Sequence, residues 1–510
     1  MRLTVKNSVA ATISLAWRAP LFVVAAVLCG SLLQAQNEDA ITIHWDKVVR
    51  VSQTNATLQV VVNPPLRRGT PVHDAAFQAL RDLHADYVRY VPWLPYPRLG
   101  VAEREPPGNG KTSWDFALID PMTIDFLEAT KNHQVILNFS TIPQWMYKTE
   151  KPVTYPDDPD QTYWDYEKGS ELRDPTMKEV ADYYARLFAW YTKGGFNDEF
   201  GRRHESGYHY SIPYWEVLNE PDLEHQMSPE TYTQLYDAVV AEIHAVDPKT
   251  KFVGMALALP SENPAYFEYF LNPKNHKKDI PLDYISYHFY AIPTADQKFE
   301  VLPFTAFTQA DGFLNVVKYI EQIRRRLSPD TRTTIDEIGT ISVDDFSQGD
   351  PGHVTQPIPN AYWNLSAAVY AYLFAELTRI GIAAAGESQL VGYPGQFPSV
   401  TMVNWTSGKP NARFWALKLL KDNFGPGDKL VETDTSGNLS ILAVVTPQGK
   451  RRVLLVNKRD HELKISVPGA AGGTVEVVDQ STAFDPPASA QLESDNLTVK
   501  GLGIAVVTLP

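Results

Sequence analysis

Short apolar segments alternate with longer amphipathic ones along most of the chain. "ATLQVVVNP" (56–64) is apolar and β-branched, as in a buried strand, whereas "VHDAAFQALRDLH" (72–84) has apolar residues at helical spacing. The alternation then repeats. It predicts strands at 56–64, 85–93, 134–140, 214–219, 251–258, 282–290, 332–339 and 381–390, and helices at 72–84, 116–133, 175–191, 229–246, 264–271, 312–327, 361–380 and 411–421.

Eight strand–helix units in this order predict a closed (β/α)8 barrel over residues 55–427. Short strands that alternate with helices indicate parallel pairing, because each helix returns the chain to the same end of the sheet. The structural alternative is a doubly wound open sheet. That fold favours a glycine-rich phosphate-binding turn after an early strand, and the sequence has none.

The pattern changes near residue 428. "LSILAVVTPQGKRRVLLVNKR" (439–459) is typical of a hairpin, and further short strands follow without any helical period. We therefore predict an all-β sandwich at 428–510. Residues 41–53, which precede the first barrel strand, are a candidate for an additional strand of this domain.

The N-terminus is typical of a secretory signal peptide. Basic residues Arg2, Lys6 and Arg18 precede an apolar run at 19–33, and a polar segment follows. We expect residues 1–35 to be removed and the protein to be secreted or periplasmic, with no stable membrane span afterwards. The alternative is an uncleaved anchor, for which the apolar run is short.

Composition excludes several classes of function. The formal net charge is −14, with acidic residues spread along the chain, which argues against a nucleic-acid partner. The only cysteine, Cys29, lies within the predicted signal peptide, so disulfides and thiolate chemistry are not expected. The histidines lack the spacing of a ligand set, and we expect no metal and no cofactor. Nothing in the sequence indicates an oligomeric state.

Reactive side chains gather at the predicted C-terminal ends of the strands, where barrel enzymes carry their active sites. The candidates are Arg89, Asn219, Glu220, His288, Tyr290, Asp336, Glu337 and Glu387. The stretch "YWEVLNEPD" (214–222) is notable because a carboxylate at the end of an apolar strand is costly unless it is used. Two carboxylates on opposite sides of a barrel mouth suggest glycoside hydrolysis, in which one acid protonates and the other attacks.

Other readings of these residues stay open. Glu220 and Glu337 could each be a salt-bridged structural acid, and Glu387 could bind a sugar hydroxyl or anchor a loop. Glu216 shares its side-chain parity with Glu220, and we interpret it as structural and paired with an arginine. The absence of a second acid would favour a non-catalytic carbohydrate-binding protein, whereas the pair favours an enzyme.

Aromatic residues that follow strand ends are candidates for sugar contacts. Trp145 and Trp405 are in this position, and aromatic faces pack well against the C–H groups of sugar rings. His288 precedes Phe289 and Tyr290 at a strand end, which favours a place in the sugar site over a structural role.

The sequence resembles clan A glycoside hydrolases, and within them glycoside hydrolase family 39, which contains β-xylosidases and α-L-iduronidases. "YWEVLNEPD" is similar to the Asn-Glu-Pro motif of that clan, and "DYISYHFY" (283–290) to its sixth strand. The segments 113–146 and 402–420 resemble the family's second helix with third strand and the end of its barrel. The resemblance covers about residues 55–425 and implies a (β/α)8 fold followed by a β-sandwich.

The resemblance also implies roles. Glu220 would be the acid/base, and Glu337 the nucleophile of a retaining reaction with a covalent intermediate. Asn219 would bind the sugar 2-hydroxyl, and Tyr290 and Arg89 would steady the carboxylate of Glu337. A tryptophan at position 405 would form the floor of the first subsite. The expected partner is an oligosaccharide or a substrate derived from a polysaccharide.

The seventh strand departs from the family pattern. The family has Thr-Glu followed by an aromatic residue, whereas this chain has Asp336-Glu337-Ile338. Strand alternation predicts opposite faces for Asp336 and Glu337, so that only one can reach the sugar. An exo-acting, β-xylosidase-like enzyme is our first interpretation. The alternatives are a uronic-acid-removing enzyme, for which Arg98 or Lys148 could supply the cation, and a transglycosylase with the same residues.

Overall fold

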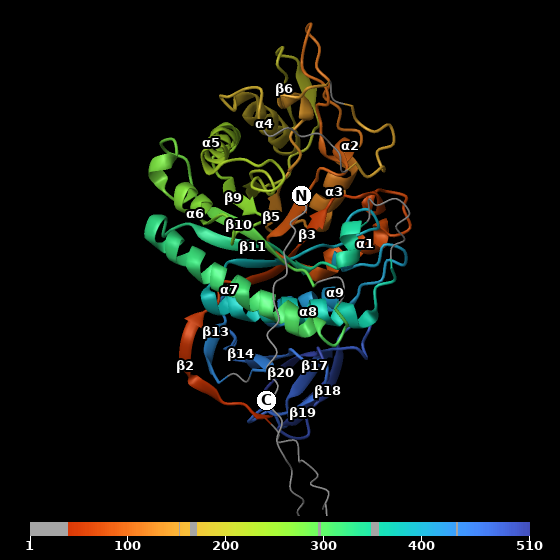
Figure 1. The fold of residues 1–510 in the computed structure, drawn as a ribbon, viewed down its shortest axis with the longest axis vertical. Helices are drawn as coiled ribbons and strands as arrows, with labels where there is room; N and C mark the ends of the chain where they lie inside the picture. The colour runs from red at the N-terminus through yellow and green to blue at the C-terminus, as the bar shows by residue number, and fades with distance from the viewer. Residues whose placement is uncertain (1–38, 152–153, 164–170, 294–296, 348–355, 435–436) are drawn as a thin grey trace, which may run out of the picture. The chain divides into compact units, whose positions relative to one another are not determined.

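Eight parallel strands form a closed barrel in the computed structural model, which describes residues 39–151, 154–163, 171–293, 297–347, 356–434 and 437–510. Each strand pairs in parallel with its neighbours, and β12 closes the barrel against β3. The predicted (β/α)8 fold is confirmed (Figure 1). The barrel strands are β3 (Asn55–Val61), β4 (Val88–Val91), β5 (Val135–Leu137), β8 (Tyr214–Glu216), β9 (Lys251–Leu257), β10 (Tyr284–Ala291), β11 (Arg332–Thr340) and β12 (Ala384–Glu387).

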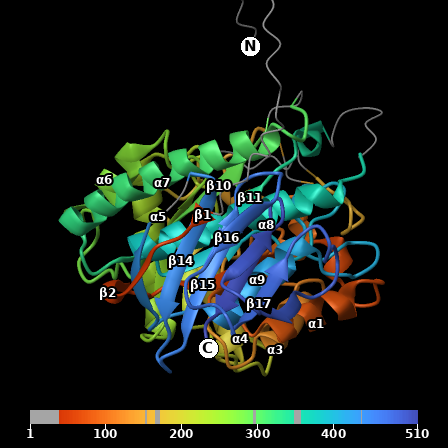
Figure 2. The same cartoon turned by 90° about the horizontal axis from the view of Figure 1, so that it is seen from below.

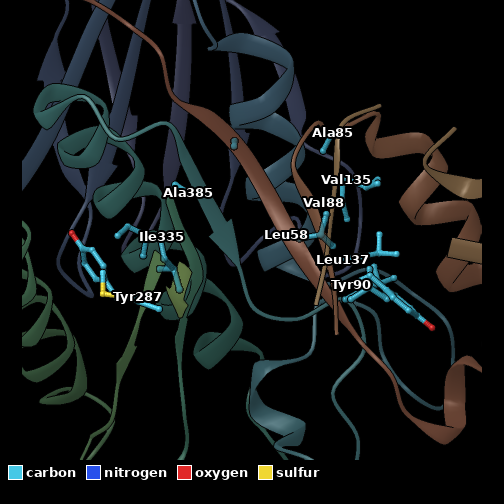
Figure 3. Packing of buried hydrophobic residues seen from close by; sticks show 14 of the residues in the cluster. Leu58, Ala85, Val88, Tyr90, Val135, Leu137, Tyr287, Ile335 and Ala385 are labelled. Atoms are coloured by element: carbon cyan, nitrogen blue, oxygen red, sulfur yellow. The ribbon is translucent and has the colours of Figure 1, made fainter. Parts of the chain in front are cut away.

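Alternation along the strands separates an apolar layer from a polar interior. Figure 3 shows Val88 and Tyr90 of β4 beside Leu137 of β5 in the layer of buried apolar side chains. Tyr90 stacks on Phe126 of the helix layer with ring centroids 4.6 Å apart. Arg89 lies between Val88 and Tyr90 in the sequence and therefore faces the barrel interior, where it is fully buried.

Helices cover the outside of the barrel. Ser228 begins one of them by accepting a hydrogen bond from the Thr231 backbone N–H, with Pro229 in the first turn, as the sequence signature predicts. The larger helices are α1 (His73–Leu83), α3 (Asp120–Ala129), α4 (Lys178–Thr192), α5 (Pro229–Val246), α6 (Pro264–Phe270), α7 (Leu302–Leu327), α8 (Asn360–Ile380) and α9 (Ala412–Asn423). The short helix α2 spans Pro97–Gly100.

Helix α7 corrects one expectation from the sequence. The periodicity predicts a helix only at 312–327, but the helix begins at Leu302, with Pro303 in its first turn. Gly312 and the polar residues before it interrupt the apolar period, so the first part of the helix resembles a loop. That first part reaches the mouth of the barrel.

The C-terminal region is an antiparallel β structure, as predicted. Its larger sheet has the order β18–β17–β20–β15–β14–β13–β2, and a smaller sheet has the order β1–β16–β19. The segment 43–51, which is β2, pairs with β13 at the edge of the larger sheet. The strands are β1 (Asp39–Ala40), β2 (Ile43–Val51), β13 (Lys429–Thr433), β14 (Leu439–Val445), β15 (Arg451–Asn457), β16 (Leu463–Ser466), β17 (Thr474–Val478), β18 (Ala488–Gln491), β19 (Asn496–Val499) and β20 (Ile504–Thr508).

Helices α8 and α9 contact both the barrel and the larger antiparallel sheet (Figures 1 and 2). The Trp415 indole donates to the Phe484 carbonyl at 3.1 Å, and Arg452 donates to the Asn423 carbonyl at 2.6 Å. Leu442 and Leu454 of the sheet belong to the same buried cluster as the barrel core. The sheet therefore supports the barrel on the side of these two helices.

A small hairpin of β6 (Gly195–Asn197) and β7 (Arg203–Glu205) follows α4. The predicted signal peptide, 1–35, lies outside the described residues. Within the part of the chain that is described, no helix has both the length and the apolar character needed to cross a membrane.

Candidate active site

A cavity of about 980 Å³ lies at the C-terminal ends of the barrel strands. Among the described residues, its charged lining consists of Glu220, Glu224, Glu262, Glu337 and His288, without any lysine or arginine. Most of the other lining residues are apolar. The described lining is therefore acidic at a few points and apolar elsewhere, and His288 is its one basic side chain.

Glu337 is fixed by two donors. Arg89 Nη1 donates to Glu337 Oε1 at 2.5 Å, and the Tyr290 hydroxyl donates to Oε2 at 2.6 Å. Only 9% of the Glu337 side chain is exposed, and this part lines the cavity. A guanidinium and a phenol that both donate to one carboxylate fix its position and orientation.

Arg89 connects this carboxylate to the other side of the barrel. Its Nη2 donates to Asn219 Oδ1 at 2.7 Å, and its Nη1 also donates to Gln59 Oε1 at 2.8 Å. Gln59 in turn donates to the Ser388 hydroxyl at 2.6 Å, which lies 2.7 Å from the Tyr290 hydroxyl. Each side chain in this network is restrained by hydrogen bonds to other side chains of the network.

Glu220 lies on a tight turn after β8. Leu218 and Glu220 both have left-handed backbone conformations, with φ of 65° and 41°. The Glu220 backbone N–H donates to the Ala256 carbonyl of β9 at 3.0 Å, which fixes the turn against the next strand. Such strained positions persist where the surrounding structure holds them, and they are concentrated at functional sites.

The environment of Glu220 raises the pKa of its carboxyl group. Burial raises the pKa of Glu220, whereas His288, whose Nδ1 lies 2.8 Å from Glu220 Oε1, opposes that rise. The negative charge of Glu337 contributes to the rise. Only 14% of the side chain is exposed, so little water is available to stabilise the anion.

The two carboxyl groups face each other across a short gap. One oxygen of Glu220 and one of Glu337 lie within 4.8 Å, and His288 offers a nitrogen within the same distance of both. These three groups could by spacing hold a metal ion. Each is already engaged, however, because His288 is bonded to Glu220 while Arg89 and Tyr290 occupy Glu337.

Asp336 corrects the expectation from strand alternation. Both Asp336 and Glu337 face the barrel interior, since Arg89 lies 3.5 Å from Asp336 and 2.5 Å from Glu337. Register shifts in β10 and β11 interrupt the regular alternation there. Only Glu337 lines the cavity, whereas Asp336 is buried one layer deeper.

Asp336 places negative charge behind His288. His288 Nε2 lies 3.4 Å from Asp336 Oδ1. Burial alone would raise the pKa of Asp336, but the charge of Arg89 and the hydrogen bond from His288 hold it at about 2. Burial would likewise lower the pKa of His288, but Glu337, Asp336 and Glu220 raise it well above its usual value. The imidazolium form is therefore favoured, and its Nδ1–H donates to Glu220.

Two further acids are structural. Glu216 accepts from Arg89 at 2.5 Å and from the Ser286 hydroxyl at 2.6 Å, as its predicted pairing with an arginine requires. Burial raises the pKa of Glu216 to about 8. Glu387 is buried against Arg413 at 2.9 Å and is not among the described residues that line the cavity, which favours the interpretation as an anchor at the end of β12.

The two tryptophans expected at the sugar site lie outside the cavity lining. The Trp145 indole donates to the Glu103 carbonyl at 2.8 Å, and the Arg173 guanidinium lies 4.5 Å from its ring. Trp405 packs partly buried against the barrel core. A position after a strand end does not determine where a side chain points, because the loop that carries it can turn outward.

Other residues line the cavity in their place. Trp93 and Phe397 face each other with ring centroids 6.2 Å apart. Glu224 accepts from the Trp93 indole at 2.5 Å and from the Asn219 amide at 3.0 Å. Trp93 ends a predicted strand, so the criterion that selected Trp145 could have found it. Phe397 and Glu224 lie in loops and carry no such signal.

Comparison with known proteins agrees with this geometry. Residues 202–362, which include Glu220, His288 and Glu337, match the sequence model of glycosyl hydrolases family 39. No curated protein matches the chain significantly.

Several solved structures share the fold at low sequence identity. A GH51 arabinofuranosidase from Xanthomonas axonopodis pv. citri aligns with a TM-score of 0.63 and 14% identity, over 92% of this chain and 99% of that one. A glucosidase from Croceicoccus marinus has a TM-score of 0.59 and 15% identity, over 92% and 98%. A GH30 endoxylanase from Clostridium papyrosolvens has a TM-score of 0.56 and 14% identity, over 92% and 99%.

Proposed function

We propose that this glycoside hydrolase, of which residues 202–362 match the family 39 model, is an exo-acting glycosidase of the β-xylosidase type. In this proposal Glu337 is the nucleophile and Glu220 the acid/base. The observation that carries the proposal is the pair of opposed carboxyl groups, whose nearest oxygens lie within 4.8 Å. Retaining glycosidases separate their carboxyl groups by about 5–5.5 Å, whereas inverting enzymes need about 6.5–9.5 Å to admit a water molecule.

The two environments match the two roles. In the first step, Glu337 attacks the anomeric carbon while the bond to the leaving oxygen breaks and Glu220 gives that oxygen its proton. Arg89 and Tyr290 hold the Glu337 carboxylate in position through their hydrogen bonds. In the second step, Glu220 takes a proton from water, and the water oxygen displaces Glu337 from the sugar.

The lining of the cavity argues against a uronic-acid substrate. A uronate needs a cation at its carboxylate, and the described lining contains no lysine or arginine. Arg98 donates to the carbonyl of Asp157, and Lys148 pairs with Glu171, so neither candidate faces the cavity. A neutral sugar suits the site better. The structural neighbours are named as arabinofuranosidases, a glucosidase and an endoxylanase, so both pentosides and a glucoside belong in the test.

Hydrolysis of 4-nitrophenyl glycosides tests the proposal. The panel contains β-xyloside, β-glucoside, β-galactoside, α-L-arabinofuranoside and glucuronide, and we expect the β-xyloside to be cleaved fastest, with retention observed by proton NMR. Fast cleavage of the glucuronide, or release of the inverted sugar, would contradict the proposal.

Two variants separate the roles of the carboxyl groups. Glu337→Gln should lose turnover of every substrate, by a factor of at least about 10³, because no covalent step remains. In Glu220→Ala, the turnover of 4-nitrophenyl glycosides should fall less than in Glu337→Gln. The glycosylation step with 2,4-dinitrophenyl glycosides should be retained, because their leaving group needs no proton. Glu230→Gln, at an exposed position on α5, is the control and should be unchanged.

We also propose that the protein is exported, on the basis of the basic and apolar pattern at 1–35. N-terminal sequencing of protein recovered from the medium or periplasm should begin near residue 36. A mature protein that begins at Met1, or that stays inside the cell, would contradict export.

A further inference from the structure

The cavity also includes residues from the loop after β9, the end of β10 and helix α7. In the barrel, β9 and β10 lie between β8, which precedes Glu220, and β11, which carries Glu337. The walls of this part of the cavity are formed mainly by aliphatic and phenyl side chains. This part, which we call the α7 groove, is lined by Leu259, Pro260, Phe289, Ile292, Phe313 and Val316.

Helix α7 presents one continuous face to the α7 groove. Gln309, Gly312, Phe313 and Val316 all line the cavity, at the three- and four-residue spacing of a single helical face. Phe313 stacks on Phe289 with ring centroids 4.6 Å apart, so the apolar wall is rigid on this side.

Gly312 keeps the α7 groove open. A β-carbon added at this position would meet no atom within 4 Å, and its backbone does not require glycine. Glycine inside a helix is unfavourable relative to alanine, so its presence here calls for a reason other than packing or backbone geometry. Space for a ligand beside the helix is such a reason.

The rim of the α7 groove is apolar and exposed. Leu223 is 51% exposed and Ile292 is 39% exposed, although both are large hydrophobic residues beside the catalytic carboxyl groups. The Gln309 side chain donates to the Ile292 carbonyl at 3.0 Å and accepts from its N–H at 2.8 Å, so this polar side chain is occupied with backbone. Ser261 and Glu262 are the other polar residues of this part.

One wall of the α7 groove is bonded to the turn that carries Glu220, the proposed proton donor to the leaving group. Glu220 gives its proton to the leaving oxygen, and the Asp222 carboxylate that follows it accepts from the Ala258 and Leu259 backbone N–H groups, both at 3.0 Å. The loop that forms one wall is thereby bound to the turn that carries Glu220. Glu337, in contrast, is held by Tyr290 and Arg89.

We propose that the α7 groove binds an apolar aglycone, either an alkyl chain or an unsubstituted aromatic group, so that the substrate is the glycoside of a hydrophobic alcohol. The inference rests on the proposed glycosidase function and specifies its substrate class. A second sugar would need several donors and acceptors for its hydroxyl groups. The aliphatic side chains that dominate this part of the cavity supply none.

Aglycone preference tests the inference by kinetics. For the sugar that is cleaved fastest, kcat/KM is measured on the methyl glycoside, the octyl glycoside below its critical micelle concentration, and the disaccharide. Each buried methylene is expected to contribute about fourfold, so the octyl glycoside should exceed both others by at least about tenfold. Equal values for octyl and methyl glycosides, or a preference for the disaccharide, would overturn the inference and leave the glycosidase function intact.

Gly312→Phe provides the structural test. The phenyl ring should occupy the groove and reduce the ratio of octyl to methyl kcat/KM toward one. Lys318→Leu is the control, because it adds apolar surface at an exposed position of the same helix that does not line the cavity, and it should leave the ratio unchanged. An unchanged ratio in Gly312→Phe would overturn the inference.

Binding of 1-octanol tests the proposed aglycone site independently of the proposed glycosidase activity. Calorimetric titration with 1-octanol requires no turnover, and the unmodified protein should bind it whereas Gly312→Phe should not. Octanol binding in the absence of any glycoside hydrolysis would support the groove and contradict the proposed function. Hydrolysis without octanol binding would support the function and contradict the groove.

Discussion

The two carboxyl groups of the cavity, Glu220 and Glu337, have different surroundings. Glu337 lies in a polar network that contains a buried arginine, whereas Glu220 has one polar side-chain partner, His288, and an apolar groove beside it. Hydrogen bonds from Arg89 and Tyr290 fix the carboxylate of Glu337 in place, while burial raises the pKa of Glu220. Identical side chains can thus take different roles because their surroundings differ.

This difference also has a cost in stability. Arg89 lies close to Glu216, Asp336 and Glu337, all of them buried, so the network around the nucleophile depends on one cation. Among the described residues, no second buried arginine with several acidic partners lies beside Glu220. Substitutions on the two sides should therefore differ in whether they affect stability or proton transfer.

The largest effect is expected from Arg89→Met. The change leaves three buried acids without their cation and should lower the free energy of unfolding by about 3–5 kcal/mol. Chemical denaturation measures the loss. Arg68→Met is the control, since Arg68 forms an exposed pair with Asp125 and should cost at most about 1 kcal/mol. Equal losses for the two variants would contradict the importance of the buried network.

His288→Gln should change the pH dependence. His288 opposes the rise in the pKa of Glu220, so its removal should raise that pKa further. Since Glu220 acts in its protonated form, the alkaline limb of kcat/KM should move to higher pH. We expect a fall of about tenfold in kcat as well, because the acid becomes weaker.

His276→Gln is the matched control for His288→Gln. His276 is also bonded to a buried acid, Asp237, at 2.6 Å, but it lies outside the cavity lining. Its replacement should lower stability without moving the alkaline limb. A shift of the alkaline limb to lower pH in His288→Gln would contradict the prediction that His288 lowers the pKa of Glu220.

Tyr290→Phe removes one donor from the nucleophile. A hydrogen bond to a charged group contributes about 1.5–3 kcal/mol, so kcat should fall by about ten- to a hundredfold. Tyr287→Phe is the control on the same strand, because the Tyr287 hydroxyl is buried without a hydrogen-bond partner in the described structure and faces away from the cavity. Similar kinetic losses in both variants would contradict the proposed role of Tyr290.

The smallest effect is expected from Gly312→Ala, on the apolar side. The helix should gain about 0.5–1 kcal/mol of stability, because the position is open and the backbone is helical. In Gly254→Ala, by contrast, the added atom would lie 2.5 Å from the Phe270 ring, and the protein should lose stability. Denaturation of both variants measures the difference, and a loss of stability in Gly312→Ala would show that the position is not open.

Much of the site could be predicted because parallel strands bring their C-terminal ends together. Arg89, Asn219, Glu220, His288 and Glu337 are far apart in the sequence, yet hydrogen bonds connect them into one network. The link between His288 and Glu337 is an ion pair at 3.6 Å, and the others are hydrogen bonds. The convergence follows from the barrel, whose strand order is determined once eight strand–helix units are counted. The family resemblance then supplied roles that spacing alone could not.

The parts that could not be predicted depend on local irregularity. Asp336 faces inward because the register shifts near it, which strict alternation cannot show. The start of α7 was missed because Gly312 interrupts the helical period, although that residue gives the groove its space. Trp145 turns outward in its loop toward Glu103 and Arg173. Loop conformation is set by tertiary contacts, which no local pattern of residues encodes.

Trapping the covalent intermediate tests the central claim most directly. A 2-deoxy-2-fluoro glycoside with a 2,4-dinitrophenyl leaving group, built on the preferred sugar, should inactivate the enzyme and label it once. Mass spectrometry should place the label on Glu337, with none on its neighbour Asp336, and Glu220→Ala should still be labelled. A label on Asp336, or turnover that proceeds without an adduct and with inversion, would contradict the assignment of Glu337 as nucleophile.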